Sequence, residues 1–157
     1  MLEFNSSGLL VPQSIISSTL SEFEKYFAID SPENVRRILF NQYKRYSDDL
    51  KQTCGLFELK QWIDGSFVTK KAKPFDIDLV TFLSWEIAEG KGLKDFIYPA
   101  SLTKYGIDAY IVVIYPDTHK LNFVYKADCA YWLDHFDKTK PSRRHKRVPK
   151  GFLEIIV

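Results

Sequence analysis

The sequence of 157 residues lacks the features of a disulfide-stabilised, zinc-stabilised or secreted protein. Its two cysteines, Cys54 and Cys129, form no C-x-x-C motif, and its three histidines have no metal-ligand spacing. This pattern predicts neither a disulfide framework nor a zinc site, so we expect two reduced thiols. The first 20 residues have no basic start and only a short apolar run, so they do not indicate a secretion signal.

Long apolar runs are also missing. No stretch approaches the roughly 18 residues that a membrane span needs, so we expect no membrane partner and a cytoplasmic location. The formal net charge of +2 does not by itself predict nucleic-acid binding. Positive charge is instead concentrated in residues 138–150, which hold seven Lys and Arg residues and no acidic residue.

Apolar and aromatic residues are plentiful, at 45% and 15%, which is sufficient for one domain over residues 1–157 with a ring-rich core. Apolar periodicity predicts the order helix, helix, strand, strand, helix, strand, helix, strand. This order indicates an α+β (mixed α/β) domain with a small sheet flanked by helices. We expect a helical part in residues 1–55 and a sheet-bearing catalytic core in residues 56–157.

The individual elements follow from local signals. The first helix is expected over Ile16–Phe27, after an irregular start. The second begins with the cap Ser31-Pro32 and ends at Cys54-Gly55. Strands are expected over residues 57–63, 76–83, 107–115 and 152–157, and further helices within residues 85–100 and 125–136.

Two carboxylates stand at the start of the second expected strand. Because side chains alternate along a strand, Asp76 and Asp78 point to the same side. Two adjacent like charges repel, and burying them without partners is costly. A divalent cation at a strand end would stabilise such a pair, and Mg²⁺ prefers these hard oxygen ligands.

A glycine–serine turn lies ten residues upstream of Asp76. Gly65 has no side chain, so the backbone can approach a ligand closely there. Ser66 offers a hydroxyl and a backbone N–H group, which favour a phosphate oxygen. The turn therefore predicts an anion-binding position.

Asp108 is the only charged residue in the apolar segment 107–115. If this strand lies beside the strand 76–83, Asp108 completes a cluster of three carboxylates. Two metal ions would then be held there, with Asp108 as general base or metal ligand. An aspartate so close to Gly106 also fits a simple turn residue, so both interpretations stay open.

The two segments that carry these residues are WIDGSFVTKKAKPFDIDLV and GIDAYIVVI. Together they resemble the DNA polymerase beta-like nucleotidyltransferase superfamily, and the resemblance covers about residues 57–115. The short chain is similar to small prokaryotic stand-alone members, including the minimal nucleotidyltransferases of toxin–antitoxin and phage-defence systems. The ending KGFLEIIV is similar to the C-terminal strand of one group of short members.

The resemblance implies a nucleotide site and a metal site. Gly65 and Ser66 would hold the nucleoside triphosphate, for example ATP. Asp76, Asp78 and Asp108 would be the catalytic residues and the ligands of Mg²⁺, with two ions expected. The sequence departs from the family pattern at Asp64, where an apolar residue is usual, and in having Lys70, Lys71 and Lys73 in place of an arginine. We expect Lys70 and Lys73 to contact the phosphates as point charges.

Three functions remain as hypotheses. The first is an enzyme that moves a nucleoside monophosphate from the triphosphate to a protein or RNA hydroxyl without a template. The second is a non-catalytic or weakly active subunit of an antitoxin or defence complex on the same fold, with a toxin or defence protein as partner. The third is a nucleic-acid-binding module that uses residues 138–150, although such a charge run is often a solvated segment. Aromatic residues are sparse in the run, so no base-stacking platform is expected within it.

Overall fold

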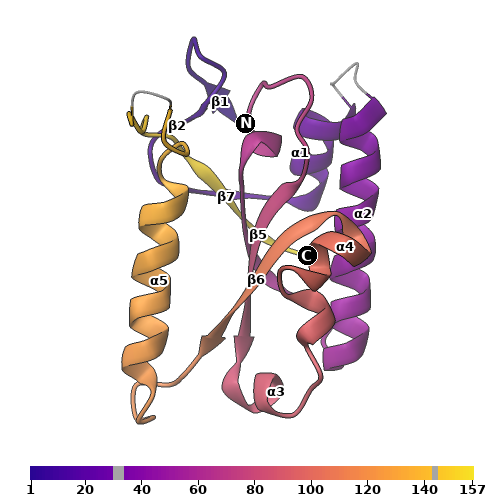
Figure 1. Ribbon diagram of the computed structural model, residues 1–157, viewed down its shortest axis with the longest axis vertical. Helices are drawn as coiled ribbons and strands as arrows, with labels where there is room; N and C mark the ends of the chain where they lie inside the picture. Colours follow the sequence, from indigo (N-terminus) through magenta and orange to yellow (C-terminus); the bar gives the residue numbers. More distant parts are fainter. Residues whose placement is uncertain (30–33, 143–144) are drawn as a thin grey trace.

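The computed structural model describes residues 1–29, 34–142 and 145–157. The protein is a mixed α+β structure, as its sequence predicts, with a five-stranded sheet between helices (Figure 1). The strand order is β3-β7-β4-β5-β6. Strand β4 is antiparallel to both of its neighbours, whereas the pairs β3–β7 and β5–β6 are parallel. Two short strands pair separately at the N-terminus.

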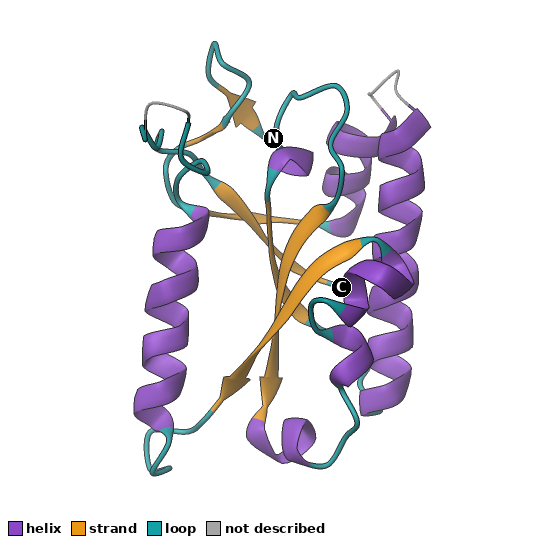
Figure 2. Ribbon diagram, viewed as in Figure 1, coloured by secondary structure: helices purple, strands orange, loops and turns teal. Residues whose placement is uncertain are grey.

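Figure 2 distinguishes the strands from the helices. The strands are β1 (Glu3–Phe4), β2 (Leu10–Val11), β3 (Ile15–Ser18), β4 (Lys60–Asp64), β5 (Ile77–Ser84), β6 (Ile107–Ile114) and β7 (Phe152–Ile156). The α-helices are α1 (Leu20–Glu24), α2 (Asn34–Cys54), α3 (Trp85–Glu89), α4 (Ala100–Tyr105) and α5 (Asn122–Phe136). A π-helical segment (Lys25–Ile29) and two 3-10 turns, η2 (Ser66–Val68) and η3 (Lys94–Phe96), complete the elements.

The two faces of the sheet carry cores of different size. Helices α2 and α4 cover one face, and α5 lies on the other (Figure 1). On the α2 face, alternate residues of β5 and β6, such as Leu79 and Ala109, join the larger core cluster. On the α5 face, Val80 and Val112 belong to a smaller cluster with Phe136. Side-chain alternation thus gives each strand one set of residues for each core.

Helix α2 shows why the larger core is stable. Apolar residues at spacings of three and four, Leu39, Tyr43, Tyr46 and Leu50, are all buried along one stripe. The helix ends in a Schellman arrangement at Gly55, whose φ is 69° and whose successor donates its N–H to the carbonyl of Lys51. The predicted end at Cys54-Gly55 is confirmed, whereas the predicted cap at Ser31 and Pro32 lies outside the described residues.

The N-terminal segment corrects two expectations. The predicted helix over Ile16–Phe27 is wrong at its start, because Ile16 lies in β3 and pairs with Leu153 of β7. Thr19 caps α1 by accepting a hydrogen bond from the N–H of Glu22, so the helix begins only at Leu20. The first twelve residues are also not irregular throughout, since β1 and β2 form an antiparallel pair.

The other predicted elements are present within a few residues of their expected bounds. Strands β4, β5, β6 and β7 and helix α5 match the predicted segments, and α3 lies inside the predicted region 85–100. Within the three described ranges, no helix has the length and apolar character required to span a bilayer.

Candidate active site

Three strands bring their carboxylates to one edge of the sheet. Asp64 at the end of β4 pairs with Asp78 in the antiparallel register. Asp78 in turn pairs with Asp108 across the parallel strands β5 and β6. The three residues therefore stand in a row, one strand spacing (about 4.8 Å) apart along the sheet. Asp76 directly precedes β5 at the same edge.

The row of carboxylates lies on the α5 face. Asp78 precedes Val80, and Asp108 precedes Tyr110 and Val112, by even numbers of residues, and these apolar residues pack in the smaller cluster. Asp108 lies within β6 and continues its pairing with β5. The alternative interpretation of Asp108 as a turn residue therefore does not describe its position.

The backbone of Gly65 lies directly against the carboxylate of Asp78. Its φ of 81° lies in the region that favours glycine. A Cβ atom at this position would lie 1.8 Å from Oδ2 of Asp78, which is far inside van der Waals contact. Glycine is therefore required for two reasons, the backbone conformation and the close approach of the carboxylate. The 3-10 turn that starts at Ser66 follows directly.

Arg36, which is buried on α2, holds the loop that follows Gly65. Its guanidinium donates hydrogen bonds to the carbonyl oxygens of Phe67 and Thr69, both at 2.7 Å, and of Lys71 at 2.6 Å. The group also lies over the Phe67 ring, with 5.1 Å from Cζ to the centroid. Burial lowers the pKa of Arg36 from its ordinary value. The loop is thus fixed from the opposite face of the sheet.

A cavity of about 470 Å³ opens in front of the turn. This volume lies in the range of small-molecule sites, about 300–1,000 Å³. Its wall carries the carboxylates of Asp64, Asp76 and Asp78 together with Gly65 and Ser66. The remaining wall includes four amines, those of Lys71, Lys138, Lys140 and Lys150. One cavity thus combines an acidic side, suited to a cation, with a basic side, suited to phosphate.

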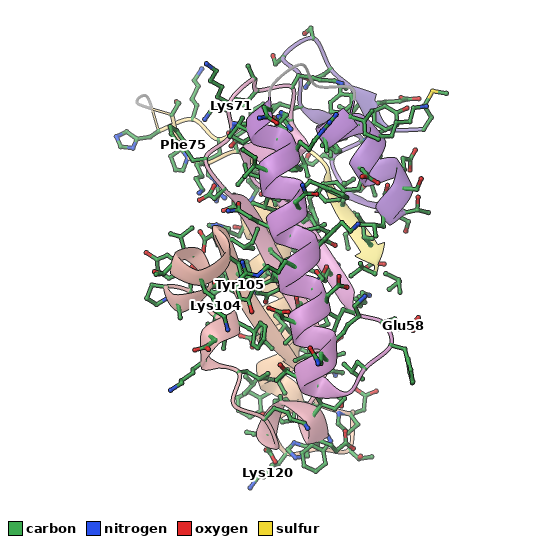
Figure 3. The ribbon with its side chains drawn as sticks, turned by 90° about the vertical axis from the view of Figure 1, so that its right-hand side faces the viewer. Glu58, Lys71, Phe75, Lys104, Tyr105 and Lys120 are labelled. Carbon is green, nitrogen blue, oxygen red and sulfur yellow. The ribbon has the colours of Figure 1, made fainter. Side chains whose placement is uncertain are left out.

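The cavity also has an exposed aromatic residue at its rim. Phe75, which is 87% exposed, lines it directly before Asp76. The amine of Lys71 lies 5.2 Å from the centroid of the Phe75 ring. Figure 3 shows Lys71 and Phe75 at the same end of the molecule. The rim therefore offers a ring and a cation beside the carboxylates.

Two lysines of the basic run contact the carboxylates. Nζ of Lys140 lies 3.3 Å from Oδ1 of Asp78. Lys150 is buried, and its Nζ donates to Oδ1 of Asp64 and, at 3.1 Å, to the carbonyl of Phe136. The described part of residues 138–150 is therefore folded against the site, rather than being only a solvated segment.

The titration behaviour of the carboxylates reflects their crowding. Burial, and then the charge of Asp78, raise the pKa values of Asp76 and Asp108 above the ordinary value. Burial also raises the pKa of Asp64 to about 6, and the charge of Lys150 opposes this rise. The charge of Asp78 raises the pKa of Lys140. A cluster of this kind favours an additional cation.

The donor set fits Mg²⁺. Oδ1 of Asp108 is buried and has no hydrogen-bond partner in the described residues, so an acceptor stands free. Within the described ranges no three His, Cys, Asp or Glu side chains converge on one point. Mg²⁺ does not require such a trio, because it commonly uses one or two carboxylates and completes its shell with water and substrate phosphates. Asp76 and Asp78 would hold it, with Asp108 as the third carboxylate on the neighbouring strand.

The sequence-predicted nucleotide contacts are brought together only in part. Gly65 and Ser66 line the cavity, but Lys70 and Lys73 do not. The amine of Lys70 lies 4.3 Å from the centroid of the Phe4 ring, and Lys73 is exposed. Lys71 and the lysines of the basic run line the cavity instead. Sequence reasoning missed their contacts with the carboxylates because no local pattern relates residue 140 to residue 78.

The fold and the site together define a small α+β protein with clustered carboxylates beside a lysine-lined cavity. Residues 2–156 match a protein family described as "Family of unknown function (DUF6932)", and the chain belongs to this family. Neither a curated protein nor a solved structure matches the chain.

Proposed function

We propose that the protein is a Mg²⁺-dependent nucleotidyltransferase. It would move a nucleoside monophosphate from a nucleoside triphosphate, such as ATP, to a protein or RNA hydroxyl in the cytoplasm. One observation carries the proposal: Asp78 lies over the Gly65 turn at the wall of a cavity that is lined by lysines, and Asp108 is its neighbour across β5 and β6. The resemblance of residues 57–115 to the polymerase beta-like superfamily supports the same conclusion.

Each group has a distinct task in this proposal. The backbone at Gly65 and the hydroxyl of Ser66 would hold the triphosphate, and Lys71 and Lys140 would neutralise its charge. Bound Mg²⁺ would supply Lewis-acid polarisation of the phosphate oxygens and stabilise the leaving group. Arg36 would keep the loop in one conformation, so that the triphosphate and the carboxylates meet in a fixed geometry.

The transfer step forms one bond, breaks one bond and moves one proton. The acceptor oxygen forms a bond to the α-phosphorus, and the bond from that phosphorus to the bridging oxygen breaks. Pyrophosphate leaves with the electron pair. The proton of the acceptor hydroxyl passes to the carboxylate of Asp108 as general base. No template takes part in this step.

A second candidate is a non-catalytic or weakly active subunit of an antitoxin or defence complex. It is favoured by the contact of Lys140 with Asp78, because this amine stands where a metal-bound substrate would meet the carboxylate. A non-catalytic subunit would show no turnover, and Lys140→Ala, which removes this contact, would not create it.

The test uses labelled nucleoside triphosphates, Mg²⁺ and candidate acceptors, with Asp78→Asn compared with wild type. We expect transfer to fall at least about a hundredfold, because losing one group that stabilises transition-state charge costs about 10²–10³ in rate. Asp117→Asn, at an exposed carboxylate 87% accessible outside the cavity, serves as the matched control and should retain full activity.

A second readout separates binding from chemistry. Mg²⁺ with a triphosphate should raise the melting temperature of wild type and of Asp117→Asn, but not that of Asp78→Asn. Equal labelling by wild type and Asp78→Asn across all acceptors would reject the enzyme. Absence of both labelling and thermal shift in wild type would favour the non-catalytic subunit.

A further inference from the structure

A second cavity, of about 320 Å³, adjoins the carboxylates. The two cavities share Asp78, His135 and Lys140, but only the second includes Asp108. The glycine turn belongs only to the first. Asp108 therefore lines a space that differs from the one expected to hold the triphosphate.

The second cavity is walled by aromatic rings. Tyr110 comes from β6, and Tyr131, Trp132 and Phe136 come from α5. The Tyr110 and Trp132 centroids are 4.7 Å apart, and those of Tyr131 and Trp132 are 5.1 Å apart at an interplanar angle of 83°. These contacting rings line one cavity, which suits a planar guest.

The rings are not needed to fill the core. Tyr131 is 60% exposed, and Trp132 is only partly buried against the smaller cluster. An exposed tyrosine beside a tryptophan, rimmed by polar groups, is typical of a binding surface.

Cations of the basic run lie beside the second cavity. Lys140 lines the cavity, and Arg147 donates to the carbonyl of His135 at 3.4 Å, next to the rings. Residues 138–150 contain no acidic side chain. Helix α5 thus supplies the aromatic residues that the run itself lacks. Stacking rings beside cations are the features by which proteins bind single-stranded nucleic acid.

We propose that the second cavity binds the acceptor, and that the acceptor is the 3′-terminal nucleoside of a single-stranded nucleic acid. This inference rests on the proposed function and names the substrate class of that same site. The terminal base stacks among Tyr131, Trp132 and Tyr110, and the 3′ hydroxyl faces Asp108. The preceding phosphates follow the basic run. A tyrosine side chain of a partner protein would also present a ring, but it would not require the adjoining cations.

The experiment measures binding of short single-stranded oligonucleotides, labelled at the 5′ end, by fluorescence anisotropy at low salt. RNA and DNA of one sequence form separate arms, which distinguish the two sources of a 3′ nucleoside. We expect Tyr131→Ala to weaken binding about tenfold, because stacking of one base on one ring has an effect of this order. Phe123→Ala is the matched control, since Phe123 is 68% exposed on the same helix and outside the cavity.

Two further measurements keep this inference separate from the proposed function. The thermal shift with Mg²⁺ and a triphosphate should be the same in wild type and Tyr131→Ala. Labelled nucleotide should appear at a free 3′ hydroxyl and not on an oligonucleotide that ends in a 3′ phosphate. The inference is overturned if no oligonucleotide binds, if Tyr131→Ala and Phe123→Ala bind alike, or if only a partner protein is labelled. In the last case the nucleotidyltransferase still stands, because labelling still depends on Asp78.

Discussion

Helices α2 and α5 lie on opposite faces of the same sheet, yet their contacts with it differ greatly. Eight residues of α2 are buried, whereas only Asn122 and Phe136 of α5 are. The α2 face also satisfies its buried polar groups: the hydroxyl of Tyr43 donates to Gln61 at 2.7 Å, and the amide of Gln61 donates to Thr81 at 3.1 Å. The α2 face therefore supplies most of the stability of the fold.

The α5 face carries the chemistry instead. All three strand carboxylates, the two cavities and the described lysines of the basic run lie on this side. Charged and exposed groups are tolerated there because the other face keeps the sheet stable. Arg36 links the two, since it reaches from α2 to the loop after Gly65. Stability and candidate function are thus divided between the faces, and this division can be tested.

The largest expected effect is on the α2 face. Phe40→Ala removes a ring that is 1% exposed and lies 5.5 Å from the centroid of Phe23. We expect a loss of about 3–5 kcal/mol in the free energy of unfolding, because the cavity cannot fully close. Tyr131→Ala on α5 should change it by at most about 0.5 kcal/mol. Guanidinium denaturation of both variants measures the contrast, and equal losses would show that the faces contribute alike.

The next effect concerns the pair Asp64–Lys150 on the α5 face, in which both side chains are buried. Lys150→Met leaves Asp64 buried without its cation. We expect a loss of about 3 kcal/mol at pH 8, the lower end of the range for breaking such a pair, because protonation of Asp64 replaces part of the interaction.

The pH dependence of this variant has a defined sign. Removing Lys150 raises the folded-state pKa of Asp64 further above its ordinary value of 3.8, so the folded state binds a proton that the unfolded state has released. Protonation of Asp64 in the folded state therefore stabilises the variant fully below that ordinary pKa. This stabilisation is lost as pH rises through the folded-state pKa. Denaturation at pH 5 and pH 8 should therefore show the larger loss at pH 8. The double variant Asp64→Leu/Lys150→Met should recover most of it, and failure to recover would mean that Lys150 acts chiefly through the Phe136 carbonyl.

Much of the fold follows from local sequence. The stripe of Leu39, Tyr43, Tyr46 and Leu50 and the glycine after Cys54 identify α2, and the apolar segments around residues 80 and 110 identify β5 and β6. Strand β3 could not be found in this way. Ile16, Leu20 and Phe23 have helical spacing, but Ile16 becomes a strand residue because β7 offers a free edge 137 residues later in the chain. Such pairing leaves no local signal.

Local sequence likewise predicts only part of the candidate site. Gly65, Asp76 and Asp78 lie close together in the sequence, and Asp108 lies in the next long apolar segment. Local sequence was therefore sufficient to identify these four residues as site candidates. The contacts of Lys140 and Lys150 with carboxylates could not be predicted, because a lysine in a basic run has the same local sequence whether it is solvated or folded onto a carboxylate. The contact of Arg36 with the loop after Gly65 likewise joins residues far apart in the sequence. The apolar residues of α5 predicted a helix correctly, but the pattern could not show that Tyr131 and Trp132 would line a cavity rather than fill a core.

The smallest expected effect tests whether the α5 face responds to pH through its histidine. His135 lines both cavities, with the Tyr131 ring stacked 5.7 Å away and Phe136 at 6.0 Å. Burial, followed by the charges of Arg147 and Lys140, lowers the pKa of His135, while Asp78 and Asp108 oppose them.

Because the folded-state pKa of His135 lies below its ordinary value of 6.5, the unfolded state binds more protons as pH falls below 6.5. This histidine therefore reduces stability as pH falls through that window, whereas the raised pKa values of Asp76 and Asp108 act in the opposite direction. His135→Gln should remove the destabilising effect of the histidine and leave the opposite effect of the carboxylates. The melting temperature of this variant should therefore fall less than that of wild type between pH 7 and pH 5. Phe40→Ala, which changes no titrating group, should keep the wild-type slope at a lower temperature. If His135→Gln also keeps that slope, His135 is equally accessible to protons in both states, and the pH response of the α5 face arises from its carboxylates alone.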